Sequence, residues 1–236
     1  RSSDLNHLLN LITGLYPADS GEFAIGGEAY FPSNIEKVTA AGIARTFQNV
    51  RLFNNMSVLE NVMVGRHVRT RNGLWAAISR HKRARAEETQ TRELAWHLLD
   101  YTGISQFAHY RACDLAYGHQ RRLEIARALA TEPRLLALDE PAAGMNAAEK
   151  MALGELLLRI RDDGKTLLMI EHDVVANLWP IELFGLQRHR SHHIAAHAVT
   201  HQTQTATVNA NFLTVLGDPF CRFIGLINCH REMGLR

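Results

Sequence analysis

The sequence lacks several features that would assign it to a class of protein at once. No run of about 18 apolar residues occurs, which excludes a membrane-spanning helix. The first ten residues are polar and contain no apolar stretch with a small-residue cleavage site, so we expect no signal peptide. Three cysteines, at positions 113, 221 and 229, are too few and too scattered for a disulfide framework or a zinc site. We therefore expect a cytoplasmic globular protein with reduced thiols.

An excess of charge of one sign is also absent. The 26 basic side chains nearly balance the 24 acidic ones, and a net charge of +2 requires no nucleic-acid partner. Arginines and Lys82 cluster within residues 66–71 and 80–85, but no aromatic residues lie between them and glutamates follow. This pattern favours a solvated helical surface over a nucleic-acid interface. Hydrophobic residues make up 46% of the chain, which is enough to form a folded core.

The last part of the chain differs in composition from the rest. No lysine follows Lys165, and residues 174–236 are rich in His, Thr, Gln and Asn without a recognisable strand or helix pattern. His193, His197 and His201 are spaced four apart, but no neighbouring carboxylate supports a metal site. We expect a structural boundary near Asp173 and an atypical segment beyond it.

Up to that boundary the pattern predicts an α/β fold. Two short apolar runs flank an amphipathic stretch, as expected for two buried strands of a parallel sheet joined by a helix. A helix-rich segment lies between elements of this core. The predicted strands cover residues 22–25, 135–138 and 167–170, and the predicted helices cover 57–65, with a Ser57–Glu60 capping box and an end at Gly65, then 79–101, 119–131 and 147–162.

Acidic side chains follow the predicted strand at 135–138. Ligands of α/β proteins bind where parallel strands end, and Asp139 and Glu140 come directly after this strand. Asp139 suits Mg²⁺, which prefers oxygen ligands, and Glu140 can accept a proton from water. The segment alone fits equally well with acids that stabilise a helix N-terminus. His172 follows the next strand and is predicted to lie at the same edge of the sheet.

A glycine-containing polar turn precedes the predicted helix at 119–131. Free backbone N–H groups at such a helix start can bind an anion, although an ordinary helix cap explains this segment as well. The turn comprises Leu115, Ala116, Tyr117, Gly118, His119 and Gln120.

Together, in this order, these segments resemble the ATP-binding subunits of ABC transporters. Phe47-Gln48 resembles the Q-loop, residues 115–120 the signature motif, residues 138–141 Walker B, residues 142–146 the D-loop, and His172 the switch histidine. Residues 42–48 and 52–62 and the Leu-Ala-Tyr-Gly form of the signature are similar to the branch that imports branched-chain amino acids. The resemblance runs from about Leu8 to Asp173.

The resemblance implies a dimeric ATPase that uses ATP and Mg²⁺ to drive transport through transmembrane permease subunits, at the inner face of the plasma membrane. It gives Gln48 contact with the metal and the attacking water, Asp139 the Mg²⁺, and Glu140 the role of general base. His172 contacts the γ-phosphate. The signature turn contacts ATP held by a second subunit, and Asn146 belongs to the nucleotide-binding set through the D-loop. No nucleic-acid partner is implied.

The pattern is broken where the phosphate-binding loop G-x-x-x-x-G-K-[ST] belongs. Leu5 stands at the lysine position, Asn6 at the first hydroxyl position, and no glycine precedes them. Since the resemblance ends abruptly near Leu8 and Asp173, one hypothesis is a shifted reading frame or a misjoined end at both termini. We expect ATP hydrolysis to be impaired in this chain. The alternative is a non-catalytic interaction protein or fragment that keeps only the docking and signature surfaces.

The resemblance also predicts an incomplete P-loop NTPase core of the ABC ATPase type, with a parallel sheet and an inserted helical subdomain. The expected segments are residues 1–48, the N-terminal part of the core; 49–132, the helical subdomain with the signature motif; 133–173, the core with Walker B, the D-loop and the switch histidine; and 174–236, the atypical tail.

Overall fold

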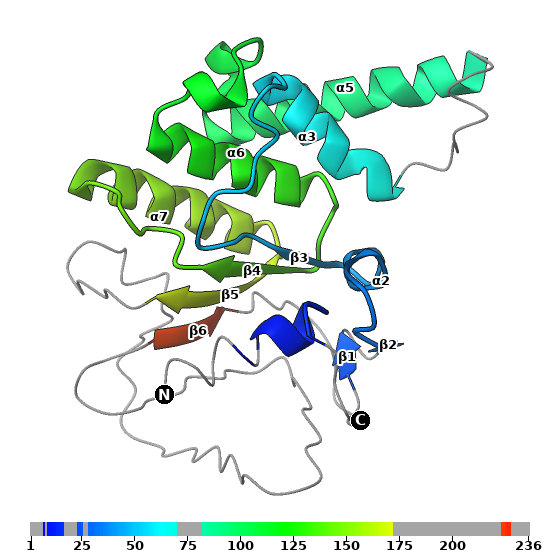
Figure 1. The fold of residues 1–236 in the computed structure, drawn as a ribbon, viewed down its shortest axis with the longest axis vertical. Helices are drawn as coiled ribbons and strands as arrows, with labels where there is room; N and C mark the ends of the chain where they lie inside the picture. Colours follow the sequence, from blue (N-terminus) through cyan, green and yellow to red (C-terminus); the bar gives the residue numbers. More distant parts are fainter. Residues whose placement is uncertain are drawn as a thin grey trace, which may run out of the picture. The chain divides into compact units, whose positions relative to one another are not determined.

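The structure, a computed structural model, describes residues 7, 9–16, 23–25, 28–69, 82–171 and 223–227 (Figure 1). The chain divides into two compact units. Unit 1 comprises residues 1–48 and 134–236, and unit 2 comprises residues 49–133. The exact boundaries of the four segments predicted from the sequence remain predictions.

Unit 1 is built on a four-stranded sheet in the order β3-β4-β5-β6. The strands β3 (Ile43–Arg45), β4 (Leu135–Asp139) and β5 (Thr166–Glu171) are parallel to one another, and β6 (Phe223–Ile227) is antiparallel to β5. A separate antiparallel pair joins β1 (Phe23–Ile25) to β2 (Glu28–Tyr30). Besides the helical residues 9–12, the described part of this unit contains the helices α2 (Ile35–Ala40) and α7 (Ala147–Asp162). The predicted α/β fold with a parallel sheet is confirmed.

The central position of β4 explains its continuous apolar sequence. Every residue of Leu135–Asp139 is buried, because β3 and β5 flank the strand and both of its faces are covered. The helix α7 follows β4 in the chain and buries Leu153, Leu156, Leu157 and Ile160, which recur at helical spacing. Gly164 follows the end of α7 with φ +82°, a conformation that glycine adopts without strain.

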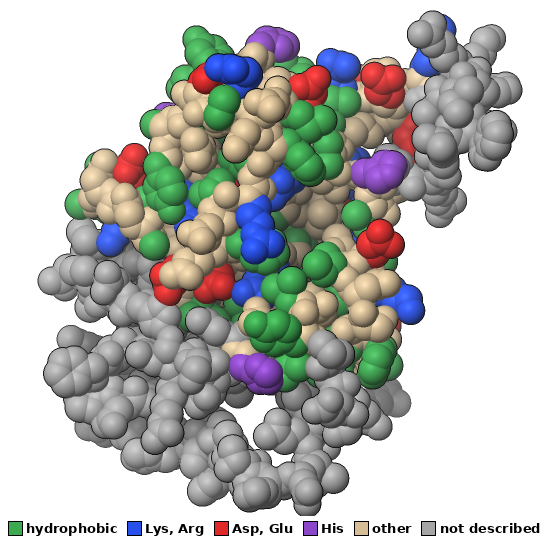
Figure 2. Space-filling model, in the orientation of Figure 1, with side chains coloured by type: hydrophobic (Ala, Val, Ile, Leu, Met, Phe, Trp, Pro, Cys, Tyr) green, Lys and Arg blue, Asp and Glu red, His purple; other side chains and the backbone are tan. Residues whose placement is uncertain are grey.

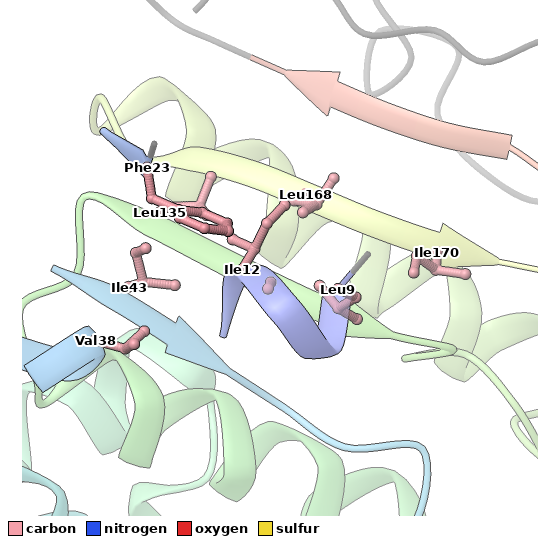
Figure 3. Packing of buried hydrophobic residues seen from close by; sticks show 9 residues of the cluster. Leu9, Ile12, Phe23, Val38, Ile43, Leu135, Leu168 and Ile170 are labelled. Carbon is pink, nitrogen blue, oxygen red and sulfur yellow. The ribbon is translucent and has the colours of Figure 1, made fainter. Parts of the chain in front are cut away.

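The second hydrophobic layer of unit 1 joins the N-terminal helical residues 9–12 to the sheet (Figure 3). Its buried side chains come from six segments of the chain. They are Leu9, Ile12, Phe23, Val38, Ile43, Leu135, Ala137, Leu168 and Ile170. This layer fixes the helical residues 9–12 beside the strands that carry the predicted site residues.

The strand β6 was not expected from the sequence. It lies within residues 174–236, where we found no strand pattern, and its residues Phe223–Ile227 pair antiparallel with Leu167–Glu171 of β5. The run is apolar but only five residues long, and a short apolar run without alternation does not distinguish strand from helix. Pairing with the edge of β5 is therefore what defines it.

Unit 2 is helical. Its helices are α3 (Val58–Arg66), α5 (Lys82–Thr102) and α6 (Tyr117–Leu129), with short 3₁₀ turns at His67–Arg69, Ser105–Phe107 and Ala112–Asp114. The helix α3 packs against both α5 and α6. The predicted capping box at the start of α3 is confirmed: Ser57 Oγ accepts from the Glu60 N–H, and a Glu60 carboxylate oxygen accepts from the Ser57 N–H at 2.8 Å. The hydrogen bonds that the Ser57 N–H and the Ser57 hydroxyl donate to the Glu60 carboxylate lower the pKa of Glu60.

Several predicted helix boundaries in unit 2 differ from the observed ones by one or two residues. The helix α3 continues through Gly65 to Arg66, and α6 begins at Tyr117 instead of His119. Gly65 has a packing role, because a Cβ there would overlap the backbone oxygen of Arg127 and lie 3.2 Å from the Ala130 Cβ. The glycine thus permits close approach of α3 and α6 and does not end the helix.

Replacing Gly65 with alanine tests this packing role. We expect Gly65→Ala to lower the free energy of unfolding of unit 2 by roughly 1–3 kcal/mol, because the added methyl group forces α3 away from the α6 backbone. Urea unfolding followed by helical circular dichroism measures the effect. The control is Val64→Ala on the same helix, whose side chain is partly exposed. Equal stability of Gly65→Ala and the control variant contradicts the packing role.

We expect the ionisation of Tyr30 to lower the stability of unit 1 at alkaline pH. Burial raises the pKa of Tyr30 from 10.0 to about 12, and its hydroxyl donates to the Ile12 carbonyl at 3.1 Å. The unfolded chain therefore loses this proton at lower pH than the folded chain, so the stability contributed below pH 10 is lost as pH rises to about 12. We expect the free energy of unfolding, measured across this pH range, to fall, and we expect Tyr30→Phe to remove that fall. An identical pH dependence in the variant disproves the assignment to Tyr30.

Candidate functional site

The predicted acids lie where the parallel strands of unit 1 end. Pairing aligns Arg45 of β3 with Ala137 of β4, and Asp139 of β4 with Ile170 of β5. The chain leaves β3 through Thr46 and Phe47 to Gln48, and leaves β4 directly into Glu140. The carboxyl edge of this sheet therefore carries the side chains of Gln48, Asp139 and Glu140, as the sequence predicted for the two acids.

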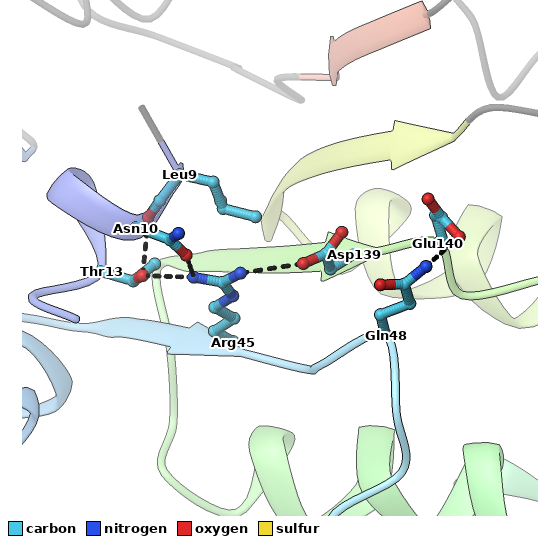
Figure 4. Close-up of polar contacts among 7 residues, drawn as sticks. All are labelled: Leu9, Asn10, Thr13, Arg45, Gln48, Asp139 and Glu140. Atoms are coloured by element: carbon cyan, nitrogen blue, oxygen red, sulfur yellow. Dashed lines mark hydrogen bonds and ion pairs between the residues drawn. The ribbon is translucent and has the colours of Figure 1, made fainter. Parts of the chain in front are cut away.

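Glu140 turns sharply away from the strand. Its φ of +44° is unusual for a residue with a side chain, and its backbone N–H donates to the Ile170 carbonyl at 2.8 Å. The Gln48 amide nitrogen donates to the Glu140 carboxylate at 2.8 Å (Figure 4). Two residues that the family resemblance places at the reaction centre, separated by 92 residues in the chain, are thus in direct contact.

Asp139 is held by Arg45, a residue that was not predicted to have a role. The Arg45 guanidinium donates to Asp139 Oδ2 at 2.8 Å, and the side chains of both residues are about nine-tenths buried, with 9% and 11% exposed. The same guanidinium donates to Asn10 Oδ1 at 2.6 Å and Thr13 Oγ1 at 3.0 Å. The signal available in the sequence was a single charged residue at the end of an otherwise apolar strand, Ile43–Arg45.

His172 lies outside the described residues. Its predicted role beside the γ-phosphate therefore stays a prediction.

The predicted signature turn lies in unit 2, at the start of α6. Ala116 is the N-cap of this helix and its side chain makes no capping hydrogen bond, so the turn lacks the usual side-chain partner for the first N–H groups. Gln120 Nε2 donates to the Leu115 carbonyl at 2.9 Å and the His119 ring lies 4.8 Å from that of Phe107. The turn is thus held by a hydrogen bond within it and by a ring contact with Phe107, and the start of its helix suits an anion.

A buried ion pair supports the aromatic residue of this turn. Arg121 and Glu124 are each only 2% exposed and lie 3.1 Å apart. Arg121 Nε also donates to the Tyr117 hydroxyl at 3.1 Å, and its guanidinium lies 5.4 Å from the ring centroid. Tyr117 is therefore oriented by α6 itself.

Asn146, predicted to belong to the nucleotide-binding set, has an observed structural role. It is the N-cap of α7: its side chain accepts from the Glu149 N–H at 2.9 Å, and the Glu149 side chain accepts from the Asn146 N–H at 3.0 Å. This capping box satisfies the first turn of α7. A contact with nucleotide remains a prediction.

The side chains at the sheet edge offer oxygen atoms, which hard cations such as Mg²⁺ prefer, but they offer few of them. Within the described part of the chain, no group of three or more His, Cys, Asp and Glu side chains could enclose a metal. Mg²⁺ is commonly held by one or two carboxylates together with phosphates and water, which Asp139 fits. None of the described helices is long and apolar enough to cross a membrane.

Comparison with known proteins agrees with this arrangement. Residues 7–143 match the family described as ABC transporter. The high-affinity branched-chain amino acid transport ATP-binding proteins BraF of Pseudomonas aeruginosa and LivG of Escherichia coli are 40% and 37% identical over 168 residues. Each alignment covers 71% of this chain and 66% of the relative, so the chain spans about two thirds of their length.

The fold comparison gives the same family. The crystal structure of the ADP conformation of MJ1267, an ATP-binding cassette of an ABC transporter, is 30% identical with a TM-score of 0.60. That alignment covers 74% of this chain and 68% of the cassette. The matched residues 7–143 include Gln48, the signature turn, Asp139 and Glu140. The chain therefore belongs to the ABC transporter family.

Proposed function

We propose that this chain is an ATP-binding and ATP-hydrolysing subunit of an ABC importer of branched-chain amino acids, with hydrolysis impaired by the altered phosphate-binding loop. The observation that carries the proposal is the contact of Gln48 with Glu140 beside Asp139 at the carboxyl edge of the sheet. The names of BraF and LivG supply the transported class of solute.

The metal side of the proposed site fits the residues present. Asp139 offers carboxylate oxygens and Gln48 an amide oxygen, both of which are ligands that Mg²⁺ accepts. The Gln48 amide nitrogen donates to Glu140, so a metal contact of this side chain would use its amide oxygen. Bound Mg-ATP supplies the phosphoanhydride bond that water cleaves. We assign Mg²⁺ to Asp139 and Gln48 on this donor chemistry.

The other site residues have separate proposed roles in ATP hydrolysis. Glu140 accepts the proton of the attacking water at its carboxylate, as a general base does. Gln48 holds that carboxylate through its amide N–H and so limits its orientation. His172, which follows β5, is proposed to contact the γ-phosphate. The signature turn, Leu115 to Gln120, presents the uncapped start of α6 to the nucleotide of a second subunit, with Asn146 as a further contact.

The proposed partners are transmembrane permease subunits and a second ATP-binding subunit, which places the chain at the cytoplasmic face of the plasma membrane. Figure 2 shows acidic and basic side chains interspersed on the face it draws. Arg66 pairs with Glu132 at 2.7 Å, and Arg69 Nε donates to the Thr131 carbonyl at 2.7 Å. These contacts favour a structural role for Arg66 and Arg69 of the basic cluster at residues 66–71. They support the proposal that nucleic acid is not a partner.

The second candidate function is a non-catalytic interaction protein. It is favoured by Leu5 and Asn6 at the positions of the phosphate-binding lysine and hydroxyl residue, because neither side chain neutralises phosphate. Under this alternative the surfaces for the permease and the signature turn remain in use, and nucleotide is not bound.

Direct binding of Mg-ATP and release of phosphate separate the two functions. If the chain is an ATPase, calorimetry detects saturable Mg-ATP binding that Asp139→Asn abolishes. Glu140→Gln then keeps binding but lowers hydrolysis by at least about 100-fold, because it cannot act as a base.

The matched control is Glu155→Gln, an exposed glutamate on α7, which leaves binding and hydrolysis unchanged. Absence of saturable binding in a folded chain rejects the ATPase function and supports the interaction protein.

A further inference from the structure

We propose that Arg45 is a positioning residue that fixes the Asp139 carboxylate and couples it to the helical residues 9–12. The assignment of Asp139 to a metal rests on the proposed function. The coupling itself is a property of this chain and can be measured without nucleotide.

The guanidinium of Arg45 joins two parts of unit 1. One terminal nitrogen, Nη2, donates to Asp139 Oδ2 at 2.8 Å, while Nη1 donates to Asn10 Oδ1 at 2.6 Å and Thr13 Oγ1 at 3.0 Å (Figure 4). A guanidinium is planar, so its donors point in fixed directions. The positions of the three acceptors are consequently tied to one another.

The contacts of Arg45 continue into the backbone of the helical segment. The Thr13 hydroxyl donates to the Leu9 carbonyl at 2.6 Å, and this directs its proton away from Arg45 and leaves its oxygen to accept. The Asn10 carbonyl accepts from the N–H groups of Leu15 and Tyr16, at 2.9 and 3.2 Å. A displacement of the segment therefore moves both acceptors that hold Nη1.

Burial distinguishes this ion pair from a surface pair of the same unit. The Arg45 and Asp139 side chains are 9% and 11% exposed, whereas Arg134 and Glu28, 3.1 Å apart, are 55% and 72% exposed. A buried charge that loses its partner is strongly destabilised, while an exposed pair contributes little. The Arg45 guanidinium also lies 5.2 Å from the Phe47 ring centroid, which limits its movement.

The pairing uses one oxygen of Asp139. Figure 4 shows the second carboxylate oxygen directed away from Arg45. A side-on pairing would use both Nη2 and Nε of the guanidinium, yet the buried Arg45 Nε has no hydrogen-bond partner among the described residues. Arg45 thus holds Oδ2 and leaves Oδ1 for a hard cation. This is the arrangement expected of a residue that orients a metal ligand.

A double-mutant cycle tests the coupling. Asn10→Ala and Asp139→Asn are combined, and the unfolding equilibrium constant of each variant is measured in urea. With Arg45 present we expect the two effects to deviate from additivity by about fivefold or more. In the Arg45→Gln background, or Arg45→Lys if that variant does not fold, the deviation disappears.

The control background is Arg134→Gln, which removes the exposed ion pair between Arg134 and Glu28. We expect the deviation from additivity to persist in this background. Additive effects of Asn10→Ala and Asp139→Asn in the presence of Arg45 overturn the proposal.

Binding of Mn²⁺, followed by electron paramagnetic resonance, tests the orientation of Asp139. Arg45→Lys keeps the charge but loses the fork, so we expect Mn²⁺ affinity to fall about tenfold, as for other residues that orient metal ligands. Arg134→Lys is the matched control and leaves the affinity unchanged.

Equal affinity in Arg45→Lys and the unaltered chain overturns the positioning role. If the unaltered chain binds no Mn²⁺ either with or without ATP, the metal site of the proposed function fails, and the double-mutant cycle still decides whether Arg45 couples Asn10 to Asp139.

Discussion

The parallel pairing of β3 with β4 is the constraint on which the site depends. Residues 45 and 139 are 94 positions apart, and only the register that aligns Arg45 with Ala137 brings the guanidinium to the Asp139 carboxylate. The same register brings Gln48 to Glu140 a short distance beyond the strands. Because side chains alternate between the faces of a strand, a slip of one residue would place Arg45 on the opposite face and break both contacts.

Burial determines the surroundings of the two acids at this edge of the sheet. Asp139 ends a strand that is covered on both faces, and a carboxylate in such surroundings requires a partner. Arg45 provides one, while Asn10, Thr13 and the Phe47 ring hold the arginine in place. Glu140 is instead carried out of the strand by its unusual φ and contacts the more exposed Gln48. Two adjacent acids thus have different surroundings, which suits the different roles proposed for them.

Local patterns and family resemblance identify some of these residues in the sequence, whereas residues whose roles depend on distant contacts carry no local signal. The strand before Asp139, the capping box at Ser57 and the helix after Asn146 follow from residues within a few positions of one another. Gly65 was interpreted as a helix end because glycine often has that role. It lies inside α3 because α6, more than fifty residues later, needs the space, and a pattern confined to α3 does not contain that information.

The sequence by itself determined the two central strands β4 and β5, the longer helices, the acid pair that follows a buried strand, and the family that the chain resembles. These properties follow from hydrogen bonds and apolar periodicity within single segments. The tertiary structure decided the strand order, the addition of β6 to the edge of β5, and the choice of Arg45 as the partner of Asp139. Those outcomes depend on burial and charge pairing between segments tens of residues apart, which become neighbours only when the core is packed.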